Sequence, residues 1–204
     1  MAAQSTQKPT VFIVDDDAAI RFAMQALMDS VNLEHDIFDS GDEFLEKITE
    51  QRPGCLVLDI RMPGLGGLEL QEELIKRGNT LPIIFITGHG DVPMAVEAMQ
   101  KGAVDFIQKP FRDQELLDRI REALATDEER REEQQQHAEV VERLHRLTNR
   151  EREVFDLVVT GKPNKVIAYE LGVSQRTVEI HRARVMEKMQ ARSLADLVKM
   201  HMTA

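Results

Sequence analysis

Residues 10–124 contain five repeats of a short apolar run followed by an amphipathic stretch. The apolar runs are continuous, which is typical of strands buried on both faces of a parallel sheet. The predicted strands are 10–14, 34–38, 55–58, 82–86 and 104–107, and the predicted helices are 18–30, 41–50, 67–77, 93–101 and 113–124. The pattern predicts an α/β fold, in which helices cover both faces of a five-stranded parallel doubly wound sheet.

The pattern changes at residues 125–146, which are almost purely polar, rich in helix formers and free of Gly and Pro. Apolar residues return only from Val140 onward. We expect a continuous or nearly continuous helical linker between two domains, 1–124 and 147–204. The linker is either a solvated spacer or a dimer coiled coil, and it has too few apolar heptads to decide between them.

Residues 147–204 are predicted to be all helical. Thr148 and Glu151 have the spacing of a capping box, in which each satisfies a main-chain N–H of the other. Helix-capping residues are expected at Thr148, Asn164, Ser174 and Ser193, and glycines at 161 and 172 mark helix ends. These capping residues and glycines predict four short helices.

The two predicted domains differ in net charge. The net charge of the 204-residue chain is −10, yet residues 147–204 carry 10 Lys/Arg against 7 Asp/Glu. This asymmetry indicates two modules with different partners. The single cysteine, Cys55, excludes an internal disulfide and fits a reducing compartment. Residues 1–8 are polar and no apolar run approaches ~18 residues, so we expect a cytoplasmic protein without a membrane partner.

Polar residues follow four of the predicted strands. Asp15 and Asp16 follow the first, Asp59 ends the third, and the last two are followed by Thr87 and by Lys109. The carboxyl ends of parallel strands form the ligand-binding edge of such sheets. Taken singly, each residue is most often a cap or a solvated side chain. Together they predict a site where Asp59 is the nucleophile that forms an aspartyl phosphate beside a cation.

An alternative is a phosphohydrolase that uses Asp59 as its nucleophile. Such enzymes commonly need a second, acid–base Asp two residues later, and Arg61 occupies that position. A guanidinium cannot donate and accept protons in turn. The sequence therefore favours a switch over an enzyme.

The helix expected from Gln175 has two distinct faces. Val178, Val185 and Met189 form one face, and the opposite face carries Arg176, Glu179, Ile180, Ala183, Arg184 and Glu187. In a helix-turn-helix unit, Glu179 could accept from cytosine, and Ile180 or Ala183 could contact a thymine methyl. Three further residues suit DNA phosphates: Lys165, Thr177 and Lys188. Periodicity alone also allows a helical dimerisation bundle with a solvated face.

The motifs Val14-Asp15-Asp16, Asp59-Ile60-Arg61-Met62-Pro63-Gly64, Ile86-Thr87-Gly88 and Lys109-Pro110-Phe111 resemble the flavodoxin-like receiver domain of two-component response regulators. The resemblance implies that Asp59 accepts a phosphoryl group from a sensor histidine kinase. It also implies Mg²⁺ (or Mn²⁺) bound by Asp16, Asp59 and the main-chain carbonyl of Arg61, with Asp15 orienting the metal's waters. Thr87 and Lys109 would contact the phosphoryl group.

In that family, the threonine moves toward the phosphoryl group and an aromatic side chain fills the space it leaves. Phe106 is the matching aromatic here, and its alternative role is that of a plain core residue. The movement reshapes the surface of the fourth helix and fifth strand, so the resemblance implies a homodimer that forms on phosphorylation.

The motifs Leu147 to Val154, Gly161 to Lys165 and Ser174 to His181 resemble the LuxR/NarL helix-turn-helix domain. Together the two domains resemble the FixJ/NarL class, nearest to its FixJ branch. The resemblance implies a transcription regulator, leaning toward an activator, with double-stranded promoter DNA and RNA polymerase as partners. The remaining alternative is a receiver-containing adaptor without phospho-dependent DNA binding.

Overall fold

A computed structural model describes residues 8–48, 51–88 and 92–203, with the side chain of Val92 excepted. The chain divides into two compact units, residues 1–130 and 131–204. The strands are β1 (Thr10–Val14), β2 (His35–Phe38), β3 (Gly54–Asp59), β4 (Ile83–Thr87) and β5 (Asp105–Gln108). The helices are α1 (Ala18–Ser30), α2 (Gly41–Lys47), α3 (Gly67–Lys76), α4 (Val92–Gln100), α5 (Asp113–His145), α6 (Asn149–Val159), α7 (Asn164–Leu171), α8 (Gln175–Met189) and α9 (Leu194–Thr203).

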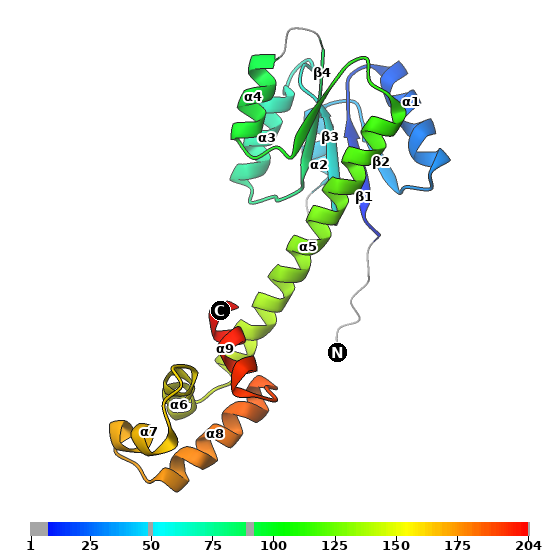
Figure 1. The fold of residues 1–204 in the computed structure, drawn as a ribbon. Coiled ribbons are helices and arrows are strands. Elements are labelled where there is room, and N and C mark those ends of the chain that lie inside the picture. Colours follow the sequence, from blue (N-terminus) through cyan, green and yellow to red (C-terminus); the bar gives the residue numbers. More distant parts are fainter. Residues whose placement is uncertain (1–7, 49–50, 89–91, 204) are drawn as a thin grey trace. The chain divides into compact units, whose positions relative to one another are not determined.

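The first unit is a parallel sheet in the order β2-β1-β3-β4-β5 with helices on both faces (Figure 1). Successive side chains of a strand point to opposite faces. Accordingly, Phe12 of β1 packs in a cluster with α2, α3 and α4, whereas Ile13 packs in a second cluster with α1 and α5. The predicted doubly wound α/β fold is confirmed. This arrangement places the ends of β1, β3, β4 and β5 along one edge.

The predicted strands and helices agree with the observed ones to within a few residues, apart from two features. The helix expected at 41–50 ends at Lys47, and residues 49–50 lie outside the described part of the chain. Gly88, His89 and Gly90 predict a turn between two elements, but His89 and Gly90 also lie outside the described part of the chain. The helix expected at 113–124 and the helical linker form one continuous helix, α5, which crosses the boundary between the units.

The second unit is all helical, as expected, with a core shared by α6, α7, α8 and α9 and by the last turns of α5. Val140 and Leu144 of α5 are buried in this core. The capping box of Thr148 and Glu151 is present, and Ser174 caps α8. The cap expected at Asn164 is wrong, because Pro163 is the N-cap of α7. Asn164 instead accepts a hydrogen bond from Arg182 of α8 through its side-chain oxygen.

Candidate functional site

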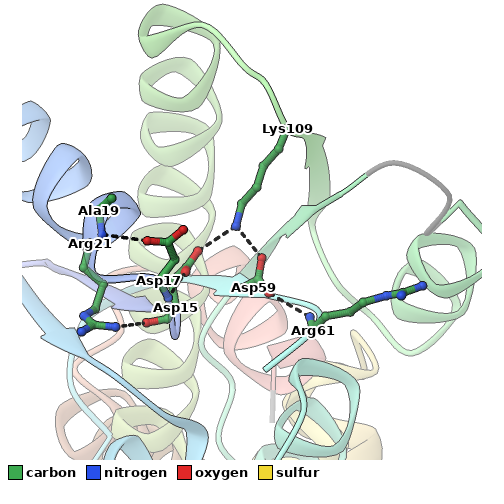
Figure 2. A network of polar contacts seen from close by, with 7 residues as sticks. All are labelled: Asp15, Asp17, Ala19, Arg21, Asp59, Arg61 and Lys109. Carbon is green, nitrogen blue, oxygen red and sulfur yellow. Dashed lines mark hydrogen bonds and ion pairs between the residues drawn. The ribbon is translucent and has the colours of Figure 1, made fainter. Parts of the chain in front are cut away.

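Asp59 is buried at the end of β3, the central strand of the sheet (Figure 2). Its Oδ1 accepts a hydrogen bond of 2.6 Å from Lys109 Nζ, and its Oδ2 accepts one of 2.9 Å from the main-chain N–H of Arg61. Burial raises the pKa of Asp59 above its usual range, and the hydrogen bond from Lys109 opposes that rise. Asp59 is therefore a desolvated carboxylate with one cation against it.

Lys109 follows β5 and contacts the carboxylates at the ends of β1 and β3. Its ammonium also lies 2.9 Å from Oδ2 of Asp15, which is buried after β1. Burial disfavours the ammonium, but the hydrogen bonds to Asp59 and Asp15 outweigh this cost and raise the pKa of Lys109. The lysine is half-buried and remains charged between two carboxylates. The structure thus brings together Asp15, Asp59 and Lys109, as the sequence predicted.

Asp16 and Arg61 lie on the outer side of this cluster. Both are exposed and both line a cavity between the loop after β3 and helices α3 and α4. Within the residues that the structure describes, no group of three or more His, Cys, Asp or Glu side chains is arranged to hold a metal.

Thr87 and Phe106 occupy neighbouring strands. Thr87 is buried at the end of β4, and its hydroxyl donates to the carbonyl of Gly88 at 2.9 Å. Phe106 is paired in register with Phe85 of β4. Its side chain is 40% exposed, so the alternative reading of Phe106 as a plain core aromatic is wrong.

The exposed face of α8 agrees with the helical periodicity. Val178, Val185 and Met189 are buried, and the candidate base-reading face is exposed: Arg176, Glu179, Ile180, Ala183 and Arg184. Lys165 is exposed on α7. Thr177 is half-buried at the start of α8, where its main-chain N–H donates to the capping hydroxyl of Ser174.

Lys188 does not belong to this face. Its ammonium lies 2.6 Å from Oε2 of Glu151 and donates to the main-chain carbonyl of Arg146. Glu151 is only 2% exposed, so the lysine neutralises a buried carboxylate. We correct the expected role of Lys188 from a phosphate contact to a structural ion pair between α6 and α8.

The contacts of two polar residues in the first unit were not predicted from the sequence. Asp127 is buried, although it lies in the almost purely polar linker. Its carboxylate accepts from Gly54 N–H at 2.9 Å and pairs with Arg130. Arg21 of α1 donates to the main-chain carbonyl of Asp15 at 2.7 Å. Both side chains pair with a main-chain group, Gly54 N–H or the Asp15 carbonyl, and a main-chain partner leaves no mark in the residue pattern.

The geometry is that of a parallel α/β domain with an acidic, lysine-paired sheet edge in one unit and of an all-helical domain in the other. A family model described as "Response regulator receiver domain" matches residues 11–121, and one described as "Bacterial regulatory proteins, luxR family" matches residues 145–201. None of the described helices is both long and apolar enough to cross a membrane.

Relatives match nearly the whole chain. Nodulation protein W of Bradyrhizobium diazoefficiens is 49% identical over 98% of this chain and 88% of its own. The transcriptional regulatory protein FixJ of Azorhizobium caulinodans is 45% identical, over 95% and 92%. The solved response regulator StyR is 45% identical with a TM-score of 0.88, covering 97% of this chain and all of its own.

The chain therefore belongs to the FixJ-like response regulators, which combine a receiver domain with a LuxR-type DNA-binding domain. It is a response regulator of a two-component system. Its family consists of transcription regulators, not enzymes, and the two domains imply a histidine kinase and DNA as partners.

Proposed function

We propose that Asp59 is the phosphoacceptor and that its phosphorylation by a histidine kinase controls promoter binding by residues 147–204. The observation that carries the proposal is the cluster of Asp59, Asp15 and Lys109 at the ends of three strands. We assign residues 1–124 to the receiver, 125–146 to the linker and 147–204 to the DNA-binding domain. The unpaired, buried Cys55 supports a cytoplasmic site of action.

Phosphoryl transfer requires a nucleophile and a cationic group that binds the phosphoryl oxygens. A carboxylate oxygen of Asp59 attacks the phosphorus of a phosphohistidine; the new O–P bond forms as the N–P bond breaks, and the histidine nitrogen keeps that electron pair. Lys109 already lies 2.6 Å from Oδ1 of Asp59, so a small movement brings its ammonium onto a phosphoryl oxygen. Arg61 offers no acid–base carboxylate for hydrolysis, which favours a lasting aspartyl phosphate.

The oxygen donors of the site fit a hard divalent cation. Receiver domains of response regulators typically bind Mg²⁺, and Mg²⁺ favours one or two carboxylates together with phosphate oxygens. We propose that Asp16, Asp59 and the carbonyl of Arg61 hold Mg²⁺ (or Mn²⁺) and that Asp15 orients its waters. When bound, the ion neutralises charge on the transferring phosphoryl group.

The surface of α4 and β5 supports an output by dimerisation. Four large apolar side chains are exposed there: Val96, Met99, Val104 and Phe106. A phosphoryl group adds charge and acceptor oxygens beside Thr87, which would turn its hydroxyl from the Gly88 carbonyl toward them. We propose that Phe106 then moves inward and that the altered surface pairs with a second copy.

A dimer presents two copies of α8 to two half-sites of promoter DNA. In each copy we propose base contacts from Arg176, Glu179, Ile180, Ala183 and Arg184, with Lys165 and Thr177 on phosphates. RNA polymerase would be the further partner of an activator.

The test uses the full chain, MgCl₂ and acetyl phosphate. Wild type should gain one phosphoryl group by intact mass, sediment as a dimer and bind labelled promoter duplex more tightly. Asp59→Asn should lose all three responses, whereas the matched control Asp42→Asn, an exposed carboxylate of α2, should keep them. A phosphoryl gain by Asp59→Asn would refute the acceptor assignment. Phosphorylation without any change in DNA affinity would favour the adaptor instead.

A further inference from the structure

Arg21 connects the first helix to the acidic edge of the sheet. It lies in the first turns of α1, is half-buried, and its Nη1 donates to the main-chain carbonyl oxygen of Asp15 at 2.7 Å (Figure 2). A hydrogen bond from a charged donor is stronger than one between two neutral groups. The guanidinium is therefore a strong constraint on a single peptide group, the one between Asp15 and Asp16.

All three oxygens of Asp15 accept hydrogen bonds. Its Oδ1 accepts from the main-chain N–H of Asp17 at 2.8 Å, its Oδ2 accepts from Lys109, and its carbonyl accepts from Arg21. Two of these bonds fix the side chain, and the bond from Arg21 fixes the main chain. Because a peptide unit is planar, fixing the carbonyl of Asp15 also fixes the N–H of Asp16 and the direction in which that residue leaves the strand.

Asp16 depends on this constraint more than Asp15 does. Asp15 is 2% exposed and packed, whereas Asp16 is exposed and follows the end of β1. An exposed carboxylate keeps a defined direction only if its main chain is held. Metal ligands must stay close to their productive geometry, so the residue that orients the main chain controls how well the carboxylates converge.

We infer that Arg21 is a positioning residue for the metal-binding carboxylates. It acts through the Asp15–Asp16 peptide and touches neither the metal nor the phosphoryl group. The inference rests on the proposed function, because it concerns the same site. A purely structural role, in which Arg21 only anchors α1 to the sheet, would lower stability and leave the metal affinity unchanged.

The test compares Arg21→Ala, Arg21→Gln and Arg21→Lys in the full chain. The matched control is Gln25→Ala, one turn further along α1 and exposed. The first readout is the dissociation constant for Mn²⁺ alone, from the signal of the free ion in paramagnetic resonance. The second is the Mg²⁺ concentration that gives half the maximal rate of phosphorylation by acetyl phosphate. Thermal unfolding by circular dichroism reports on stability.

We expect Arg21→Ala to weaken Mn²⁺ binding about tenfold and to raise the half-saturating Mg²⁺ concentration equally, with the rate at saturating Mg²⁺ within about twofold of wild type. Arg21→Lys should restore most of the affinity, because an ammonium can donate to the same carbonyl. The Mn²⁺ affinity of Arg21→Gln should lie between those of Arg21→Lys and Arg21→Ala. This variant tests the inference if Arg21→Ala does not fold.

An Arg21→Ala protein with the Mn²⁺ affinity of wild type and of Gln25→Ala would overturn the inference while leaving Asp59 as the acceptor. The proposed function fails by a different result, phosphorylation of Asp59→Asn. The two failures are therefore distinguishable in one series of variants.

Discussion

Replacing Glu151 by glutamine should destabilise the second unit and remove part of its sensitivity to acid. Glu151 is buried at the start of α6, where its Oε2 accepts hydrogen bonds from Lys188 Nζ at 2.6 Å and from the main-chain N–H of Thr148 at 2.8 Å. The hydrogen bond from Lys188 is the main cause that lowers the pKa of Glu151 from 4.5 to about 2. Folding therefore stabilises the charged form of the Glu151 carboxyl relative to its neutral form.

The pKa difference sets an upper limit on the effect. A drop from 4.5 to about 2 corresponds to roughly 3 kcal/mol, and solvent screening of the half-buried Lys188 reduces this to roughly 1–2 kcal/mol. Because the folded pKa is lowered, the stabilisation is complete above about pH 5. It is lost progressively as the pH falls from there toward 2.

The chain offers a selective probe for this measurement. It contains no tryptophan and one tyrosine, Tyr169 of α7, so tyrosine fluorescence anisotropy reports on the second unit within the full chain. Urea unfolding should be followed at pH 7 and pH 4 for wild type, Glu151→Gln and Glu153→Gln. The last is the matched control, since Glu153 lies on the same helix with its carboxylate in a surface pair.

Glu151→Gln should lower the free energy of unfolding at pH 7 and flatten its decrease between pH 7 and pH 4, and Glu153→Gln should stay within about 0.5 kcal/mol of wild type. Lys188→Met should be more damaging, because it leaves a buried carboxylate uncompensated. Equal pH dependence in wild type and Glu151→Gln would show that the ion pair does not govern acid stability.

Three further predictions concern the first unit. Burial raises the pKa of the Cys55 thiol to about 12, so this thiol should resist alkylation at pH 8 in the native protein and react fully in urea, as measured by intact mass. Gly54→Ala should lower stability by more than ~3 kcal/mol in urea unfolding, because its Cβ would lie 1.9 Å from a main-chain oxygen of β1. Gly78→Ala meets no atom within 4 Å and pays only for the left-handed backbone at φ 66°, so it should cost only ~1–2 kcal/mol. Asp127→Ala should leave the N–H of Gly54 unpaired and speed its hydrogen exchange, whereas Glu128→Ala, exposed one residue further on, should not.

The sheet was predictable because its three inner strands, β1, β3 and β4, are buried on both sides, and only the edge strands β2 and β5 carry partly exposed polar residues. Runs such as 55–58 can be buried only between two layers of helices, and the glycines and prolines between elements limit where each one ends. The exact ends were less predictable, because they depend on contacts beyond the local sequence. Asn164 has the chemistry of a helix cap, yet its side chain accepts from Arg182, and Pro163 takes the cap position.

The acidic site was predictable because topology alone gathers its residues. Asp59 ends β3 and Asp15 and Lys109 each follow a strand, and parallel strands end at one edge. Side-chain pairing was not predictable in the same way. Lys188 and Glu151 are 37 residues apart, and periodicity gives the face of a helix without naming the partner across it.

The position of Lys109 has a consequence for chain synthesis. Its ion pairs span 94 residues to Asp15 and 50 residues to Asp59, so they join the first, third and fifth strands. A nascent chain that stops before β5 carries both carboxylates without their cation, and burying them uncompensated is costly. The receiver therefore reaches its full stability after its last strand has left the ribosome, and a fragment lacking β5 should be less stable than the complete receiver.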